Sequence, residues 1–201
     1  MTTTSSQRRG RPRDPGVDRA LTGAALALLA DRGFAGMTMD AVAQAAGVGK
    51  PAIYRRYRDK AELVAAAIAT QLPAMDVPDL GDTEAELRGA LAQGLPADGD
   101  AYVGLIGGLA AEHRQHPELI AAFRDRVLGP RRAAVRAAIE RGQRRGDIRQ
   151  DADATALLDM LGGAFLARVF AGEDTGPRWR ASAFELWWSL VKTPHPPGAS
   201  P

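Results

Sequence analysis

Residues 38–60 constrain the fold more than any other stretch, because they specify two short helices and the turn that joins them. The apolar side chains of the first helix recur at i, i+3, i+4 and i+7 and give it one apolar face: Met39, Val42, Ala43 and Ala46. Thr38 is placed to cap this helix and Gly47 to end it, since glycine adopts the left-handed conformation of a helix end at little cost. The second helix begins at Lys50, and Pro51 is tolerated in its first turn. A turn this short crosses two helices steeply, so the sequence predicts a helix-turn-helix motif.

The outer face of the second helix and the residues after it are basic, which suits DNA. Lysine and arginine donate hydrogen bonds to phosphates and to guanine edges, while small apolar side chains can lie against a thymine methyl group. We expect Tyr54 and Lys60 to contact phosphates and Lys50 to read a base. A solvated basic face is the alternative. The residues of this segment that we expect to bind DNA are Thr38, Lys50, Pro51, Ala52, Tyr54, Arg55, Arg58 and Lys60.

The distribution of charge also places a nucleic-acid partner at the N-terminal end. Residues 1–60 hold 11 Lys and Arg residues against 5 Asp and Glu residues, net +6, whereas the remainder holds 15 against 19, net −4. Residues 1–16 lack hydrophobic periodicity, so we expect them to form a disordered basic arm. We expect Arg11 and Arg13 of this arm to enter a minor groove, as short arginine-bearing arms do. A plain solvated tail is the alternative.

Several spaced positions across residues 17–64 agree at once with a known pattern: Gly33, Phe34, Thr38, Ala43 to Val48, Ile53, Tyr54, Tyr57, Lys60 and Leu63. In these positions the segment resembles the DNA-binding domain of the TetR family of bacterial transcriptional regulators. Gly49 departs from the serine that most often caps the recognition helix in this family, and Tyr57 and Ala61 depart from a phenylalanine and an acidic residue. Glycine is an acceptable cap and tyrosine is close in shape to phenylalanine, so the resemblance stands.

The resemblance implies an all-helical homodimer that binds a near-palindromic operator, most often as a repressor. In this family the last two long helices of each chain form a four-helix bundle, and a two-fold dimer presents its recognition helices to major grooves about one helical turn apart or a multiple of it. A small molecule in the C-terminal domain shifts a connector helix and releases the DNA. The connector would be residues 59–72 here, and the pocket would lie among the helices of residues 60–170.

The rest of the chain reads as helices, so the predicted fold class is all-α: a three-helix helix-turn-helix domain followed by a helical ligand-binding and dimerisation domain. We expect helices over residues 17–32, 59–72, 83–95, 100–115, 117–145 (interrupted at Gly129-Pro130), 153–171 and 178–192. The expected domains are 17–60 and 61–193, with a flexible tail at 194–201. The chain has no cysteine, which is consistent with a reducing cytoplasm, where we place it. Its longest apolar runs fall far short of the roughly 20 residues that cross a membrane, so no membrane partner is expected.

The two final helices predict a homodimer. Residues 178–192 carry two apolar stripes, and we expect one to meet the chain's own core and the aromatic one to meet a second copy. Residues 153–171 are apolar almost all round, which also calls for a covering partner. The alternative is that an intramolecular core absorbs both stripes. The residues expected at the dimer interface are Leu161, Phe165, Val169, Phe184, Trp187, Trp188 and Val191.

The inward-facing residues of the C-terminal helices are rich in leucine and poor in polar groups, so we expect a pocket for a small, largely apolar effector. Tyr102 and His113 are the candidates to orient this effector by hydrogen bonds. A tightly packed core without a cavity is the alternative. The expected lining residues are Leu91, Tyr102, Leu105, Leu109, His113, Phe123 and Leu158.

Two other classes of function compete with that of a regulator. Glu112, His113 and His116 could ligate a metal if another ligand came from elsewhere, but the spacing of the histidines is not the i, i+4 pattern of zinc proteases. A nonspecific architectural DNA-binding protein is a further alternative. The large acidic C-terminal part argues against it, because such a protein does not require that part. We therefore expect no catalytic residues, no metal site and no cofactor, and we expect double-stranded DNA and a small-molecule effector as partners.

Overall fold

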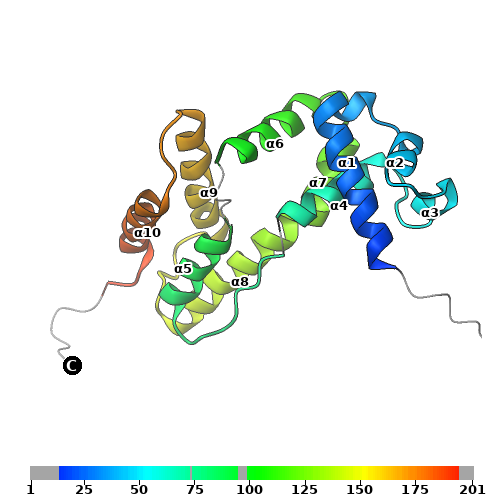
Figure 1. Ribbon diagram of the computed structural model, residues 1–201. Helices are drawn as coiled ribbons and strands as arrows, with labels where there is room; N and C mark the ends of the chain where they lie inside the picture. Colours follow the sequence, from blue (N-terminus) through cyan, green and yellow to red (C-terminus); the bar gives the residue numbers. More distant parts are fainter. Residues whose placement is uncertain (1–13, 73, 95–98, 195–201) are drawn as a thin grey trace, which may run out of the picture. The chain divides into compact units, whose positions relative to one another are not determined.

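The structure, a computed structural model, describes residues 14–72, 74–94 and 99–194, and within these ranges it contains helices and no strand (Figure 1). The all-α prediction is confirmed. The chain divides into two compact units between Ala67 and Ile68, inside α4. Arg11 and Arg13 of the expected arm lie outside the described residues. In chain order the elements are α1 Pro15–Gly36, α2 Met39–Ala45, α3 Lys50–Tyr54, α4 Lys60–Gln71, α5 Thr83–Gly94, α6 Gly99–Glu112, α7 Pro117–Phe123, the π-helical turn η1 Arg124–Leu128, α8 Gly129–Arg145, α9 Ala154–Phe170 and α10 Pro177–Val191.

The first unit is a helical core built by α1, α2, α3 and the start of α4. All four helices and the connections between them contribute buried side chains to its apolar centre. These are Leu21, Ala25, Phe34, Met37, Val42, Ala43, Ile53, Tyr57, Leu63 and Val64. Gly33 has a φ of +67°, so α1 bends at the residue where the sequence predicts its end. This core fixes the position of α3 beside α2. The outer face of α3 is the expected DNA-binding surface.

The turn between α2 and α3 forms as the local sequence signals predict. The hydroxyl of Thr38 accepts a hydrogen bond from Ala41 N at 3.1 Å, which satisfies one open N–H group at the start of α2. Gly47 has a φ of +67°, and the N–H of Val48 donates to Ala43 O at 2.9 Å. This is the closing hydrogen bond that a left-handed glycine after a helix permits. The helix-turn-helix motif is therefore present.

The second unit is centred on α8, which packs against α5 and α9, while α10 packs against α9 and α5 (Figure 1). The aromatic side chains of α10 form the middle of its core. Phe184 and Trp188 stack with ring centroids 6.3 Å apart. The indole N–H of Trp187 donates to Leu157 O at 3.0 Å, which satisfies a polar group that would be costly to bury alone. The buried cluster comprises Val77, Leu87, Ala90, Ala138, Ile139, Ile148, Leu157, Phe184, Trp187, Trp188 and Val191.

The helical segment from α7 through α8 is continuous and is not interrupted at Gly129-Pro130, contrary to the prediction. The π-helical turn η1 accommodates the proline there, and the N–H of Gly129 donates to Arg124 O, five residues earlier. A Cβ atom at Gly129 would lie 2.9 Å from that same carbonyl oxygen. Glycine is therefore required at this position to keep the wider turn closed, and the helix continues past a residue that normally ends one.

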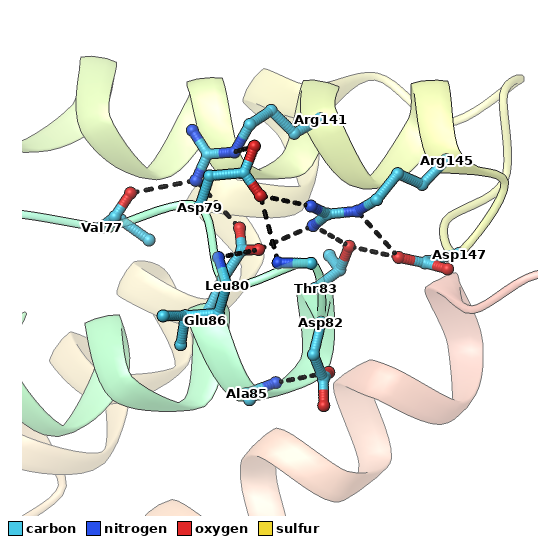
Figure 2. Close-up of polar contacts among 11 residues, drawn as sticks. Val77, Asp79, Leu80, Asp82, Thr83, Ala85, Glu86, Arg141, Arg145 and Asp147 are labelled. Carbon is cyan, nitrogen blue, oxygen red and sulfur yellow. Dashed lines mark hydrogen bonds and ion pairs between the residues drawn. The ribbon is translucent and has the colours of Figure 1, made fainter.

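A buried ion cluster joins the start of α5 to the end of α8 (Figure 2). The side chain of Glu86 is fully buried and lies 2.9 Å from Arg141 Nη2 and 2.8 Å from Arg145 Nη2. Burial alone would favour the neutral carboxyl, but the hydrogen bonds from Arg141 and Arg145 hold the pKa of Glu86 below its ordinary value. Thr83 Oγ1 accepts from Arg145 at 2.7 Å and donates to Asp147 at 2.6 Å. The cluster fixes α5 against α8, which form two walls of the cavity described below.

The end of α10 is tied to the turn that follows α8. Ile148 and Lys192 form an isolated antiparallel bridge. Arg149 N donates to Val191 O at 3.0 Å, and Thr193 N donates to Asp147 O at 2.9 Å. Two backbone hydrogen bonds therefore close the second unit at the point where its last helix ends.

Candidate functional site

The outer face of α3 is exposed, as a surface that contacts another molecule has to be. Ile53 is buried against the core of the first unit and holds the helix in place. Tyr54 is 53% exposed, and three further candidate residues are exposed beside it: Lys50, Pro51 and Arg55. Ala52 is half-buried. The structure thus brings five of the expected DNA-binding residues together on one short helix and the residue after it, and it offers a hydroxyl, an ammonium and a guanidinium group to a ligand.

Lys50 is held by a carboxylate from the preceding helix. Its Nζ lies 2.7 Å from Asp40 Oδ2, and both side chains are more than half exposed. The hydrogen bond to Asp40 raises the pKa of Lys50, so the amine stays charged. An exposed pair of this kind contributes little to stability. Lys50 can therefore exchange Asp40 for an acceptor on a partner at small cost.

Two of the expected DNA-binding residues have different surroundings from those predicted. Lys60 Nζ donates to Phe34 O at 2.9 Å and lies 4.3 Å from the centre of the Phe34 ring. The ammonium is thus engaged with the end of α1, and its expected phosphate contact stays a prediction. Arg58 lies in the bend after α3 and not on its outer face; it is 81% exposed, with its Nε 2.9 Å from Asp59 Oδ2.

Arg56 is the basic residue of this segment that faces inward. Its side chain is 6% exposed, its Nε lies 2.7 Å from Asp18 Oδ1 and its Nη1 donates to Ala52 O at 3.2 Å. This ion pair ties α3 to α1. Arg56 was not among the residues expected to bind DNA, and its contacts with Asp18 and Ala52 hold the end of α3 against α1.

The second unit contains a cavity of about 160 Å³ between α5, α8, α9 and α10. Most of its lining residues are apolar, and the two charged ones are the neighbours Arg131 and Arg132 on α8. Nη1 of Arg132 lies 2.6 Å from Asp159 Oδ1 on α9. The lining residues are Met75, Leu87, Ala90, Leu91, Leu128, Arg131, Arg132, Val135, Ile139, Leu158, Leu161, Gly162 and Trp187.

The cavity overlaps the predicted pocket only in part. Leu91 and Leu158 line it, as does Leu161, which was expected at the dimer interface. Leu105, Leu109, His113 and Phe123 are not among the lining residues; Leu109 and Phe123 are buried elsewhere, and His113 is exposed. The side chain of Tyr102 lies outside those that the structure describes.

Sequence reasoning missed the two arginines of the cavity, although a signal for them exists. Leu128, Arg131, Arg132, Val135 and Ile139 follow a spacing of i, i+3, i+4, i+7 and i+11 and line one face of the helix. Two arginines within an otherwise apolar stripe are unusual for a packed core, because arginine is rarely found fully buried.

The prediction of which stripe of α10 faces outward was wrong. Phe184, Trp187, Trp188 and Val191 are buried within their own unit, as is Phe165 of α9, while Leu186 is 66% and Leu190 55% exposed. The aromatic rings remove more apolar area from water, so they occupy the core. Val169 is half-buried. On α9 the exposed face is made largely of small residues, interrupted by two large ones: Ala156, Met160, Gly163, Ala164, Ala167 and Phe170.

The metal-site alternative can be compared with the geometry of the described residues. In the described ranges, no group of three or more His, Cys, Asp or Glu side chains is arranged to hold a metal ion. His116 Nδ1 lies 3.1 Å from Glu118 Oε1, an ordinary surface contact. None of the helices that the structure describes has the length and apolar character needed to cross a membrane.

The sequence of each unit matches a family of known regulatory proteins. Residues 21–67 match the family described as bacterial regulatory proteins, tetR family, and residues 77–184 match the family described as tetracyclin repressor-like, C-terminal domain. The uncharacterized HTH-type transcriptional regulator YdeS of Bacillus subtilis (strain 168) is 30% identical over 172 residues, which cover 83% of this chain and 85% of YdeS.

Two solved structures are similar in fold. The TetR family transcription regulator SCO0332 has a TM-score of 0.60 at 24% identity, over 87% of this chain and 96% of that one. The flavonoid-responsive regulator FrrA has a TM-score of 0.66 at 19% identity, over 92% of this chain and 100% of that one. At these identities the likeness shows a shared fold.

Proposed function

This chain belongs to the TetR family of bacterial transcriptional regulators, and on that premise we propose that it represses transcription by binding a near-palindromic operator as a homodimer. The observation that carries the proposal is a helix-turn-helix whose second helix, α3, keeps its basic outer face exposed. Ile53 and Arg56 anchor this helix from within, so Lys50, Tyr54 and Arg55 are presented on a rigid support. Rigid presentation is what base reading in a major groove requires.

The proposed dimer surface combines the exposed faces of α9 and α10. Leu186 and Leu190 on α10 and Met160 and Phe170 on α9 are all more than half exposed. Large exposed apolar side chains gathered on neighbouring helices are a usual mark of an association surface. The small residues of the α9 face, Gly163, Ala164 and Ala167 among them, allow a second helix to approach closely.

The proposed release mechanism begins at the cavity in the second unit. Met75 lines this cavity and lies four residues after the end of α4, the helix that the resemblance assigns as connector. A small molecule that displaces Met75 would act directly on the segment that follows α4. Coupling between two sites is reciprocal, so the operator must weaken the binding of the small molecule by the same factor, typically 5- to 150-fold.

Footprinting on the DNA beside the protein's own gene tests the proposal. We expect protection of one discrete near-palindromic segment, with two half-sites one helical turn or a multiple of it apart. Uniform coverage with no preferred segment would instead support a nonspecific architectural protein. The full chain should be used at physiological salt, because low salt inflates sequence-independent binding.

Variants of the α3 surface should distinguish residues that contact DNA phosphates from residues that read bases. Tyr54→Phe removes only a hydroxyl, so it should weaken binding to all sequences about equally, by about 1 kcal/mol. Lys50→Ala should change base preference at one position in each half-site, worth about 1 to 3 kcal/mol. Asp40→Asn is the matched control, because it frees the ammonium of Lys50 and should raise affinity. Binding measured on a library of single-base operator variants checks all three, and a uniform loss for Lys50→Ala would contradict its assignment.

A further inference from the structure

The cavity of the second unit is lined by apolar side chains and by two arginines, and this combination indicates the chemistry of a ligand. We propose that the effector is a small organic carboxylate with one apolar ring or a short alkyl chain, whose carboxylate is bound by Arg131 and Arg132. The inference rests on the proposed effector-controlled release of DNA and extends it by naming the chemistry of the molecule.

The charge of the residues that line the cavity indicates the charge of the ligand. Arg131 and Arg132 both line the cavity, and none of its lining side chains is an aspartate or a glutamate. The indole N–H of Trp187, the other polar side-chain group in the walls, is already donated to Leu157 O at 3.0 Å. Arginine guanidinium groups match a carboxylate geometrically through paired N–H donors. An anion is thus the ligand that this set of side chains recognises.

The backbone is built to place these arginines on the cavity wall. The turn η1 inserts one additional residue into the helix directly before α8, so the cavity-facing positions begin at Leu128 and continue through Arg131, Arg132 and Val135. Turns of this kind occur frequently at functional sites. Gly129 is needed to close the turn, because a Cβ atom there would lie 2.9 Å from Arg124 O. A costly local feature that places two arginines on the wall of a cavity is consistent with a binding role.

Asp159 acts as the resident counter-ion. Its Oδ1 lies 2.6 Å from Arg132 Nη1, and its own side chain is 56% exposed. A guanidinium carries five N–H donors, so a single carboxylate contact does not exhaust it. Asp159 therefore holds Arg132 at the edge of the chamber and competes with an incoming anion for the same donors.

The size of the chamber limits the apolar part of the ligand. Its volume is about 160 Å³, and an engineered apolar cavity of about 150 Å³ is known to bind benzene. One six-membered ring or a chain of similar volume fits, and a long acyl chain does not fit without rearrangement. The lining of Leu87, Leu91, Ile139 and Leu158 suits such a group.

Calorimetric titration of the full-length protein with benzoate, cyclohexanecarboxylate and hexanoate tests the proposal, with benzyl alcohol as a neutral molecule of the same shape. We expect at least one of the acids to bind and the alcohol to bind more weakly. Arg131→Gln and Arg132→Gln should each lower the affinity for that acid by about 10- to 100-fold, the worth of a hydrogen bond to a charged group, and leave the alcohol unchanged. Asp159→Asn should raise the affinity for the acid, because it removes the competing carboxylate.

A steric variant tests the site without touching its charge. A Cβ atom at Gly162, which lines the cavity, meets nothing within 4 Å, so Gly162→Leu fills the chamber and should abolish binding of the acid. Gly89→Leu is the matched control, because Gly89 is also a mid-helix glycine with open space at its Cβ position but does not line the cavity. It should bind the acid normally. These variants also apply if an arginine variant fails to fold.

The outcomes separate this proposal from the one on which it rests. If none of the acids binds at millimolar concentration, or if binding survives Gly162→Leu and both arginine variants, the proposed effector chemistry is wrong. Operator protection in the footprint is measured without any small molecule, so it can succeed when the titration fails. Loss of the footprint with retained acid binding would instead sink the proposed regulatory function alone.

Discussion

Replacing Glu86 by alanine should lower the free energy of unfolding by about 3 kcal/mol, because it removes the buried carboxylate that Arg141 and Arg145 share and leaves them only more exposed acidic partners. The side chains of Arg141 and Arg145 are 20% and 24% exposed, so water cannot fully replace the lost partner. Glu86 also accepts a hydrogen bond from Leu80 N at 3.0 Å, which the variant removes. Chemical denaturation followed by circular dichroism measures the change.

The same carboxylate makes stability depend on pH in a defined direction. The pKa of Glu86 is lower in the folded state than in an unfolded chain, so the unfolded state binds a proton more readily in acid. The contribution is complete above the unfolded-state pKa of about 4.3 and is lost as the pH falls through the lower folded-state pKa. The difference in stability between the wild type and Glu86→Ala should therefore shrink in acid.

Glu84→Ala is the control for this experiment, because Glu84 is on the same helix but its pair with Arg88 is 41% exposed on both sides. An exposed pair of this kind is worth at most about 1 kcal/mol. Equal losses of stability for Glu84→Ala and Glu86→Ala would show that the buried cluster does not hold α5 against α8.

Replacing Leu186 by glutamate should convert the proposed dimer to a monomer that remains folded. The side chain is 66% exposed within its own unit, so the charge does no harm there, but two-fold symmetry would bury two unpaired carboxylates in the dimer. A buried unpaired charge costs about 3 to 5 kcal/mol, which raises the dissociation constant by at least about 100-fold. Sedimentation at micromolar concentration measures the change.

Two further variants define what this result means. Leu80→Glu changes another exposed leucine outside α9 and α10 and should leave the dimer intact. Trp188→Glu places a charge in the core of the second unit and should unfold it, because Trp188 stacks on Phe184 there. A wild-type protein that sediments as a monomer would end the proposal of a dimer, whatever the variants do.

The part of the fold that local chemistry determines could be predicted from the sequence. Thr38 caps α2 and Gly47 ends it, and each acts through hydrogen bonds or backbone angles within a few residues of itself. Lys60 shows where such reasoning stops. Its partner is a carbonyl 26 residues away, at Phe34, and nothing in the residues next to Lys60 indicates it.

The assignment of faces on α10 failed for a related reason. Periodicity identifies residues that share a stripe, but it does not say which stripe meets the rest of the chain. Comparing the two stripes by buried area would have favoured the one with Phe184, Trp187 and Trp188 as the core, since an indole ring removes more apolar surface from water than a leucine. The cavity is a property of packing among four helices, so the sequence predicted only two of its lining residues, Leu91 and Leu158, in that role.

The bridge between Ile148 and Lys192 affects how the second unit opens. The last turn of a helix ordinarily frays first, because its final carbonyl groups lack partners within the helix. In this chain the carbonyl of Val191 is taken by Arg149 N, and the residue after Lys192 is bonded to Asp147. The end of α10 can therefore open only when the turn after α8 opens as well. We expect the amide hydrogens at this terminus to exchange in one cooperative event and not by gradual fraying.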